Sequence, residues 1–219
     1  MSEFKLIQGL YLYPTPAGAY QAISAPQSDK PRRFLQRLLQ LPQTPALMIE
    51  QLCLLAENTD EDKALALLHH CQKLAWVQGV DTELTVPTGA FEDILPALLG
   101  RISEDGKVLL ADEQGFYLAC SGFPHEVAEE LSALSADLMT VHKRRTGLLI
   151  NNLGIDSHAW AIVDALGGSQ IGFWPLFIGD HSFVVAIAGI PHFNQAEFVT
   201  LVWALSTRYA KKDSLLQGD

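Results

Sequence analysis

Apolar side chains recur every three or four residues between positions 28 and 80, a spacing that predicts a run of short helices. Three start signals divide this run. Pro31 follows residues that can cap a helix, Thr44 precedes a proline, and Thr59 stands three residues before a carboxylate. Gly79 is predicted to end the third helix, because glycine commonly follows the last helical turn.

Short strands are predicted on both sides of these helices. Residues 9–23 alternate aromatic and small side chains around two prolines, which indicates a hairpin, and residues 82–86 indicate one more strand. Three helices flanked by short strands resemble a winged-helix domain in layout. In such domains the chain turns from the last helix into the wing near the position that Gly79 holds after Trp76. We therefore expect a small helical, winged-helix-like domain over residues 1–87.

The second half of the chain alternates helical and strand patterns more clearly. Its turns include residues 112–115 and the pair Gly179-Asp180, both of which favour hairpins. Residues 143–158 are left open as either a helix extension or a loop. The predicted elements are a helix at 91–101, strands at 107–111 and 116–120, a long helix at 124–142, strands at 159–164, 170–178 and 181–190, and a last helix that opens at 193–198.

This order resembles the Roadblock (dynein light-chain) family. Residues 108–138, VLLADEQGFYLACSGFPHEVAEELSALSADL, have the strand, turn, strand, Ser-Gly and long helix typical of it. Residues 160–190 continue with a three-strand meander. The resemblance implies an α+β domain at 88–219 with a five-stranded, mainly antiparallel sheet and flanking helices. Pro175 falls inside one strand, where its missing amide hydrogen predicts a bulge or break.

The long helix carries two neighbouring stripes of apolar and small side chains. The bulky stripe, Val127, Leu131, Leu134, Leu138 and Val141, is predicted to face the sheet. The smaller stripe, Ala128, Ser132, Ser135 and Met139, would allow a second helix to approach closely, unless both stripes pack within one chain. In Roadblock proteins the equivalent helix and following strand form a homodimer. The resemblance therefore implies an interface of Ala128, Leu131, Ser132, Ser135, Met139, Trp160 and Ile162.

Charge changes the picture for partners. The net charge is −10, and residues 91–219 carry 16 Asp and Glu against 8 Lys and Arg. A chain this acidic is repelled by a phosphate backbone, which disfavours nucleic acid. Lys30, Arg33 and Arg37 line one helix face; a solvated surface is the first interpretation, an acidic protein partner the second and DNA the third. The first residues have no signal-peptide pattern and no apolar run is long enough to span a membrane, so we expect a cytoplasmic protein.

Candidate catalytic chemistry is weak. His69, His70 and Cys71 are consecutive, so they point in different directions around a helix and do not converge on one metal ion. The sequence has no GxSxG motif, and the glycines at 167–172 lack the ending of a phosphate-binding loop. We therefore predict no catalytic residues, no metal and no cofactor.

Two functional hypotheses remain. The first is a non-enzymatic regulatory or scaffold protein, a Roadblock-type homodimer that docks a protein partner; the resemblance implies a Ras-like small GTPase. The alternative is a transcription regulator with a winged-helix DNA-binding domain and a Roadblock dimerisation module. The third helix of the first half counts against it, because it opens with Asp60, Glu61 and Asp62.

Overall fold

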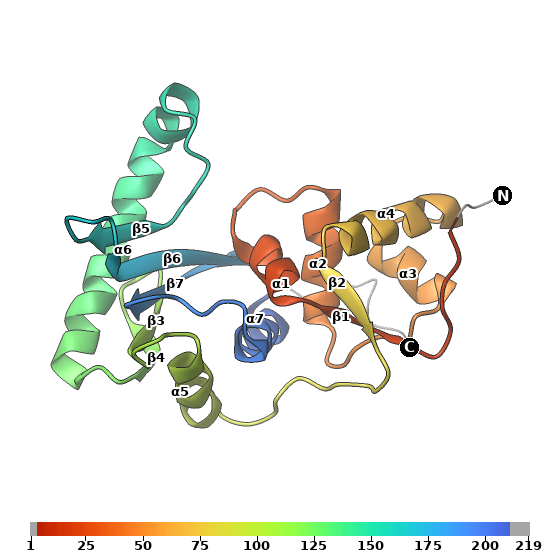
Figure 1. Cartoon of the computed structure of the whole chain (residues 1–219), viewed down its shortest axis with the longest axis horizontal. Helices are drawn as coiled ribbons and strands as arrows, with labels where there is room; N and C mark the ends of the chain where they lie inside the picture. Colours follow the sequence, from red (N-terminus) through yellow and green to blue (C-terminus); the bar gives the residue numbers. More distant parts are fainter. Residues whose placement is uncertain (1–3, 211–219) are drawn as a thin grey trace. The chain divides into compact units, whose positions relative to one another are not determined.

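The computed structural model describes residues 4–210 (Figure 1). The chain divides by its internal contacts into two compact units. Unit 1 comprises the residues up to Thr88 together with the chain from Phe198 onward, and unit 2 comprises Gly89–Glu197. These units group residues by their contacts. That the chain folds as two independent domains, 1–87 and 88–219, is still a prediction.

Unit 1 contains five helices and a two-stranded antiparallel sheet among its described residues. Asp29 caps α2 by accepting a hydrogen bond from the Arg32 amide, as residues 28–31 predict. Asp60, and not Thr59, caps α4. In chain order the elements are β1 (Tyr11–Pro14), α1 (Pro16–Ile23), α2 (Lys30–Gln40), α3 (Ile49–Leu55), α4 (Glu61–Lys73), β2 (Val77–Val80) and α7 (Ala196–Tyr209).

Several predicted features of unit 1 are wrong. The chain from 9 to 23 forms no hairpin, because β1 leads directly into α1 and pairs with β2 far along the sequence. Gly79 does not end a helix; it lies within β2, and Ala75 takes the left-handed turn after α4 with φ +54°. The strand predicted at 82–86 is reduced to a single bridge between Gln43 and Thr85.

Thr44 does not start a helix either. Its buried side chain accepts a hydrogen bond from the Leu84 amide, and α3 begins only at Ile49.

Helix α7 packs into unit 1 through its aromatic side chains. The Trp203 indole donates its Nε1–H to the Leu41 carbonyl oxygen at 2.7 Å. The Trp203 ring also meets the edge of Tyr13, with ring centroids 6.0 Å apart. An indole N–H that is buried needs such an acceptor, so this contact fixes the end of α2 against α7.

Unit 2 has the element order that the sequence predicts. Its five strands form one antiparallel sheet in the order β4-β3-β7-β6-β5, which confirms the expected five-stranded sheet with flanking helices. The elements are α5 (Phe91–Arg101), β3 (Val108–Asp112), β4 (Tyr117–Ser121), α6 (His125–Thr146), a π-helix η1 (Gly147–Asn152), β5 (Trp160–Val163), β6 (Ser169–Ile178) and β7 (His181–Ala188).

Both faces of this sheet are buried at its centre. Because side chains alternate along a strand, one face presents Leu109, Ala111, Val184 and Ala186, which form a core with Phe173 and with Ala128 of α6. Their neighbours Val108, Leu110, Val185 and Ile187 are equally buried on the opposite face. This two-sided burial explains why β3 and β7 read as continuous apolar runs.

Pro175 does not break its strand. Strand β6 runs without interruption and pairs with β7 through Pro175 and Val184. Strand β5 reaches only as far as Trp160, which pairs with Phe173, so Pro175 lies past the end of its neighbour. The missing amide donor is tolerated on this open stretch of β6. The register shift of this pair lies instead between Ile162 and Val163.

Across residues 4–210, no helix is both long enough and apolar enough to cross a lipid bilayer.

Candidate interaction surface

The small side chains of α6 face their own sheet, which corrects the predicted orientation of the helix. Ala128, Ser132 and Ser135 are fully buried in the chain, so they offer no surface to a second copy. The hydroxyl groups of Ser132 and Ser135 donate to the carbonyl oxygens of Ala128 and Leu131, each at 2.7 Å. This satisfies their hydrogen bonding within the helix and lets them pack against the sheet.

The bulky stripe of α6 lies at the border between core and solvent. Leu131, Leu138 and Met139 are half-buried against the core of unit 2. Val127, Leu134 and Val141 are exposed to 39%, 38% and 38%. They recur at intervals of seven residues, which places them on one line along the helix. The periodicity of the sequence predicts an apolar face on this helix. Which stripe packs against the sheet depends on how closely the helix can approach the strands.

Strand β5 forms one edge of the sheet, and no other strand between residues 4 and 210 pairs with its outer side. Trp160 is half-buried against the core, whereas Ile162 and Val163 are exposed to 57% and 55%. Residues 160–163 include no charge and no proline, the features that usually protect an edge strand from pairing. We call Val127, Leu134, Val141, Ile162 and Val163 the α6–β5 surface.

Two buried histidines connect the two parts of this surface. The Trp160 indole donates its Nε1–H to Nδ1 of His142 at 3.1 Å, and Nε2 of His142 lies 2.8 Å from Nδ1 of His158. An indole nitrogen only donates, so Nδ1 of His142 is the acceptor and Nε2 carries the proton that is shared with His158. His142 is thereby held neutral, and burial lowers its pKa below the usual 6.5.

The sequence did not reveal this pair as a site. His142 and His158 are separated by a helix end and a loop, so their spacing matches no metal or catalytic motif. Only the fold, which returns the chain to the sheet at β5, brings the two rings to a centroid distance of 4.8 Å.

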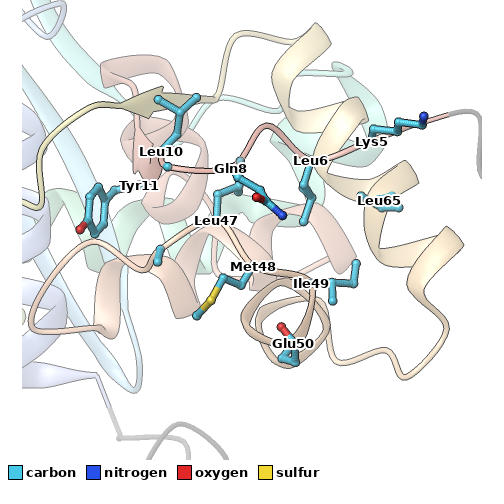
Figure 2. Close-up of a pocket in the computed structure, with 12 residues that line it drawn as sticks. Lys5, Leu6, Gln8, Leu10, Tyr11, Leu47, Met48, Ile49, Glu50 and Leu65 are labelled. Atoms are coloured by element: carbon cyan, nitrogen blue, oxygen red, sulfur yellow. The ribbon is translucent and has the colours of Figure 1, made fainter.

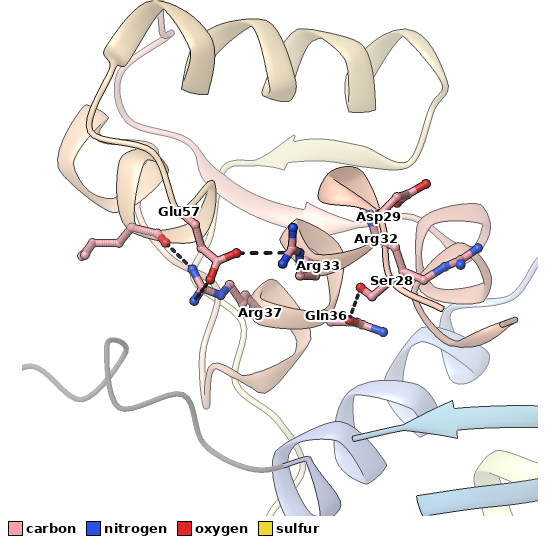
Figure 3. Close-up of polar contacts among 8 residues, drawn as sticks. Ser28, Asp29, Arg32, Arg33, Gln36, Arg37 and Glu57 are labelled. Carbon is pink, nitrogen blue, oxygen red and sulfur yellow. Dashed lines mark hydrogen bonds and ion pairs between the residues drawn. The ribbon is translucent and has the colours of Figure 1, made fainter. Parts of the chain in front are cut away.

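The basic patch predicted on α2 is only partly a surface (Figure 3). Arg37 is 3% exposed and donates hydrogen bonds to the Leu54 carbonyl oxygen at 2.8 Å and to the Glu57 carboxylate at 2.6 Å. It is therefore a structural residue and is removed from the predicted patch. Lys30 and Arg33 are exposed, and Arg33 lies 3.8 Å from the same carboxylate.

A groove of about 750 Å³ opens on unit 1 (Figure 2). It runs between residues 5–11 and residues 46–50 and is closed at one side by Leu65. Its lining is mainly apolar, with Met48 exposed to 52% at its rim. Such a groove accommodates apolar side chains of another molecule.

The described residues contain no group of three or more His, Cys, Asp or Glu side chains arranged to hold a metal ion. Of the three thiols, Cys71 is fully buried, and burial raises its pKa to about 11. A thiol of this kind stays protonated near neutral pH and is a poor nucleophile.

Comparisons with known proteins find similarity only in structure. No protein-family model matches the sequence, and no curated protein does. A Roadblock/LC7 domain from Streptomyces avermitilis is 15% identical, with 53% of this chain and 92% of that chain covered and a TM-score of 0.35. Myxococcus xanthus MglB is 14% identical, with 62% and 98% covered and a TM-score of 0.36. Unit 2 has a Roadblock-type arrangement by its own element order and sheet.

Proposed function

We propose that this protein is a non-enzymatic regulator that forms a homodimer through the α6–β5 surface and docks a protein partner. The observation that carries the proposal is that unit 2 exposes an apolar stripe on α6 and also an uncharged edge strand, β5, whose outer side pairs with no other described strand. The hydrogen bond from Trp160 to His142 joins the start of β5 to α6. Exposed apolar side chains that gather on one part of a surface are typical of protein–protein contacts.

A second copy of the chain fits this surface. In a two-fold dimer the same patch meets itself, so β5 can pair with the partner's β5 and the α6 stripes can pack together. Intervals of seven residues suit two helices that cross at a small angle. Pairing of the two edges satisfies the backbone groups that β5 leaves open and buries Ile162 and Val163.

For the docked partner we propose a Ras-like small GTPase. The support is the resemblance of residues 108–138 and 160–190 to a family whose bacterial members regulate such GTPases without carrying nucleotide. A regulator of this kind binds one conformation of the GTPase more tightly and shifts its population. The groove on unit 1 offers the partner a second, apolar contact.

Light scattering after size-exclusion chromatography tests the dimer. We expect the wild-type chain to elute as a dimer at micromolar concentration and Leu134→Asp to elute as a monomer, because the change places a charge in the buried interface. Ala133→Asp is the matched control: Ala133 is exposed on the neighbouring face of α6, so this variant stays dimeric. A strictly monomeric wild-type chain removes the proposal.

A pull-down with the wild-type chain, followed by mass spectrometry, tests the partner. Recovery of a small GTPase that depends on its bound nucleotide supports the proposal. Salt-sensitive retention of the chain on duplex DNA supports the transcription regulator instead. Nucleotide hydrolysis by the purified chain alone contradicts both.

A further inference from the structure

Helix α6 continues past the sheet into a projecting tip. The helix has 22 residues, which corresponds to about 33 Å, and η1 extends it further before the chain returns to β5 (Figure 1). We call residues 143–155 the α6 tip. The sequence does not distinguish a helix extension from a loop over residues 143–158, and the structure shows a helix extension followed by a loop.

The tip presents apolar side chains that have no core of their own. No residue of η1 is buried, and its appreciable contacts with other elements are confined to α6. Leu148, Leu153 and Ile155 are exposed to 48%, 59% and 45%. Three exposed large apolar side chains within eight residues are more than the scattered apolar exposure of an ordinary surface.

The backbone holds this segment in one conformation. The amides of Leu153, Gly154 and Ile155 donate to the carbonyl oxygens of Leu148, Ile150 and Leu149 at 3.1, 3.1 and 2.8 Å. Gly154 has φ +66° and turns the chain back toward the sheet. The apolar side chains are therefore presented by an ordered turn, which limits the conformational entropy lost when they bind.

The tip is also basic in an acidic protein. Lys143, Arg144 and Arg145 are consecutive and exposed, and no Asp or Glu occurs from residue 138 to residue 155. No ion pair is found for these three side chains within the described part of the chain. Asp137 and Asp156 flank this segment, so residues 137–156 carry three basic side chains against two acidic ones, a net charge of +1 in a chain whose net charge is −10. Acidic side chains more than about 8 Å away are largely screened at physiological ionic strength.

We propose that the α6 tip binds the surface of a membrane that contains anionic lipids. Basic side chains followed by exposed apolar ones are the combination that binds the interface of such a bilayer. The positive charges attract the lipid headgroups, while Leu148, Leu153 and Ile155 enter the boundary between headgroups and acyl chains. A projecting tip without a groove suits a lipid surface better than an acidic peptide, which needs a pocket for its side chains.

Vesicle flotation with the full chain tests the proposal. Vesicles of phosphatidylcholine alone are compared with vesicles that contain about one third phosphatidylserine. Each basic side chain near an anionic surface strengthens binding about fivefold, so the three together contribute roughly a hundredfold. We expect the chain to float with the anionic vesicles only, and half-molar salt to release it.

Two variants separate the charges from the apolar side chains. K143E/R144E/R145E is expected to lose flotation completely, and L153S/I155S to weaken it at least tenfold. The matched control K73E/R101E/K107E makes the same change in net charge at exposed basic residues outside the tip and is expected to float as the wild type does. Thermal unfolding verifies that each variant is folded.

Several results would overturn the proposal. These are equal flotation with neutral and anionic vesicles, no flotation at all, and an equal loss in the control variant. A tip variant that floats normally but changes its mass in light scattering would assign the tip to a protein interface instead. Because Leu134→Asp leaves the tip intact, a failure of the dimer and a failure of membrane binding are distinguished.

Discussion

The Trp160 indole donates a hydrogen bond to Nδ1 of His142, so the first residue of the edge strand is anchored to the long helix through a neutral histidine. Protonation of His142 places a second N–H opposite the indole N–H and removes the acceptor. The link between α6 and β5, and with it the α6–β5 surface, therefore depends on the charge of one buried ring.

The pH dependence of stability follows from this link. Burial lowers the pKa of His142, so the unfolded chain binds the proton more readily than the folded chain. The stabilisation is complete above pH 6.5, the usual histidine value, and is lost as pH falls below it. The loss is at most about 1.4 kcal/mol per pH unit for one proton. Urea unfolding between pH 7.5 and 5 measures it.

The variant His142→Leu serves as the control for this prediction. It is less stable than the wild type at pH 7.5, because Trp160 loses its hydrogen-bond acceptor and His158 loses its contact with the His142 ring nitrogen. Its free energy of unfolding is expected to change less between pH 6.5 and 5. If the free energy of unfolding changed with pH in the same way in both proteins, titratable groups other than His142 would be responsible for the change.

Two adjacent residues of α6 are predicted to act in different ways. Ser135→Leu adds volume under a fully packed sheet and is expected to lower the free energy of unfolding by about 1–3 kcal/mol. Leu134→Ser removes an exposed side chain, so it weakens association and leaves the stability of the single chain nearly unchanged. Urea unfolding and light scattering on both variants measure the two effects. If Ser135→Leu weakened association and Leu134→Ser lowered the free energy of unfolding, the small stripe would face the partner and not the sheet.

The two arginines on α2 are also predicted to differ. Arg37→Met keeps the volume but removes buried hydrogen bonds to Leu54 and Glu57, and we expect a loss of about 1.5–3 kcal/mol. Arg33→Met breaks only an exposed ion pair at 3.8 Å and is expected to change stability by less than about 1 kcal/mol. Thermal or urea unfolding gives both values. Equal effects would contradict the structural role of Arg37.

The same glycine substitution is predicted to have opposite signs at two helical positions. A Cβ at Gly18 would lie 1.9 Å from the Trp76 carbonyl oxygen, so Gly18→Ala is expected to destabilise the chain by about 1–3 kcal/mol. Gly147 has helical φ −60° and ψ −41°, and a Cβ there would make only an ordinary contact with Asn151 Nδ2, at 3.9 Å. Gly147→Ala is expected to stabilise it by roughly 0.5–1 kcal/mol. A higher melting temperature for both variants would show that helix propensity alone decides. A lower melting temperature for both would contradict the prediction for Gly147.

Periodicity and turn residues were sufficient to predict the order of elements in unit 2. The apolar runs of β3 and β4, the Gly179-Asp180 turn and the apolar periodicity along α6 are local properties, and they are enough to give the order of helices and strands. Unit 1 was predicted less well, because β1 pairs with β2 across more than sixty residues. No local signal distinguishes that pairing from a hairpin.

The sequence by itself determined that α6 is amphipathic and that the chain is acidic. Only the tertiary structure decided which stripe of α6 faces the sheet. The stripe of small side chains packs against the sheet, because Ala128, Ser132 and Ser135 allow the helix to approach strands β3 and β7 closely. The same packing left Leu134 exposed. In unit 1, the tertiary structure buried Arg37 against Leu54 and Glu57, residues that are distant from it along the chain.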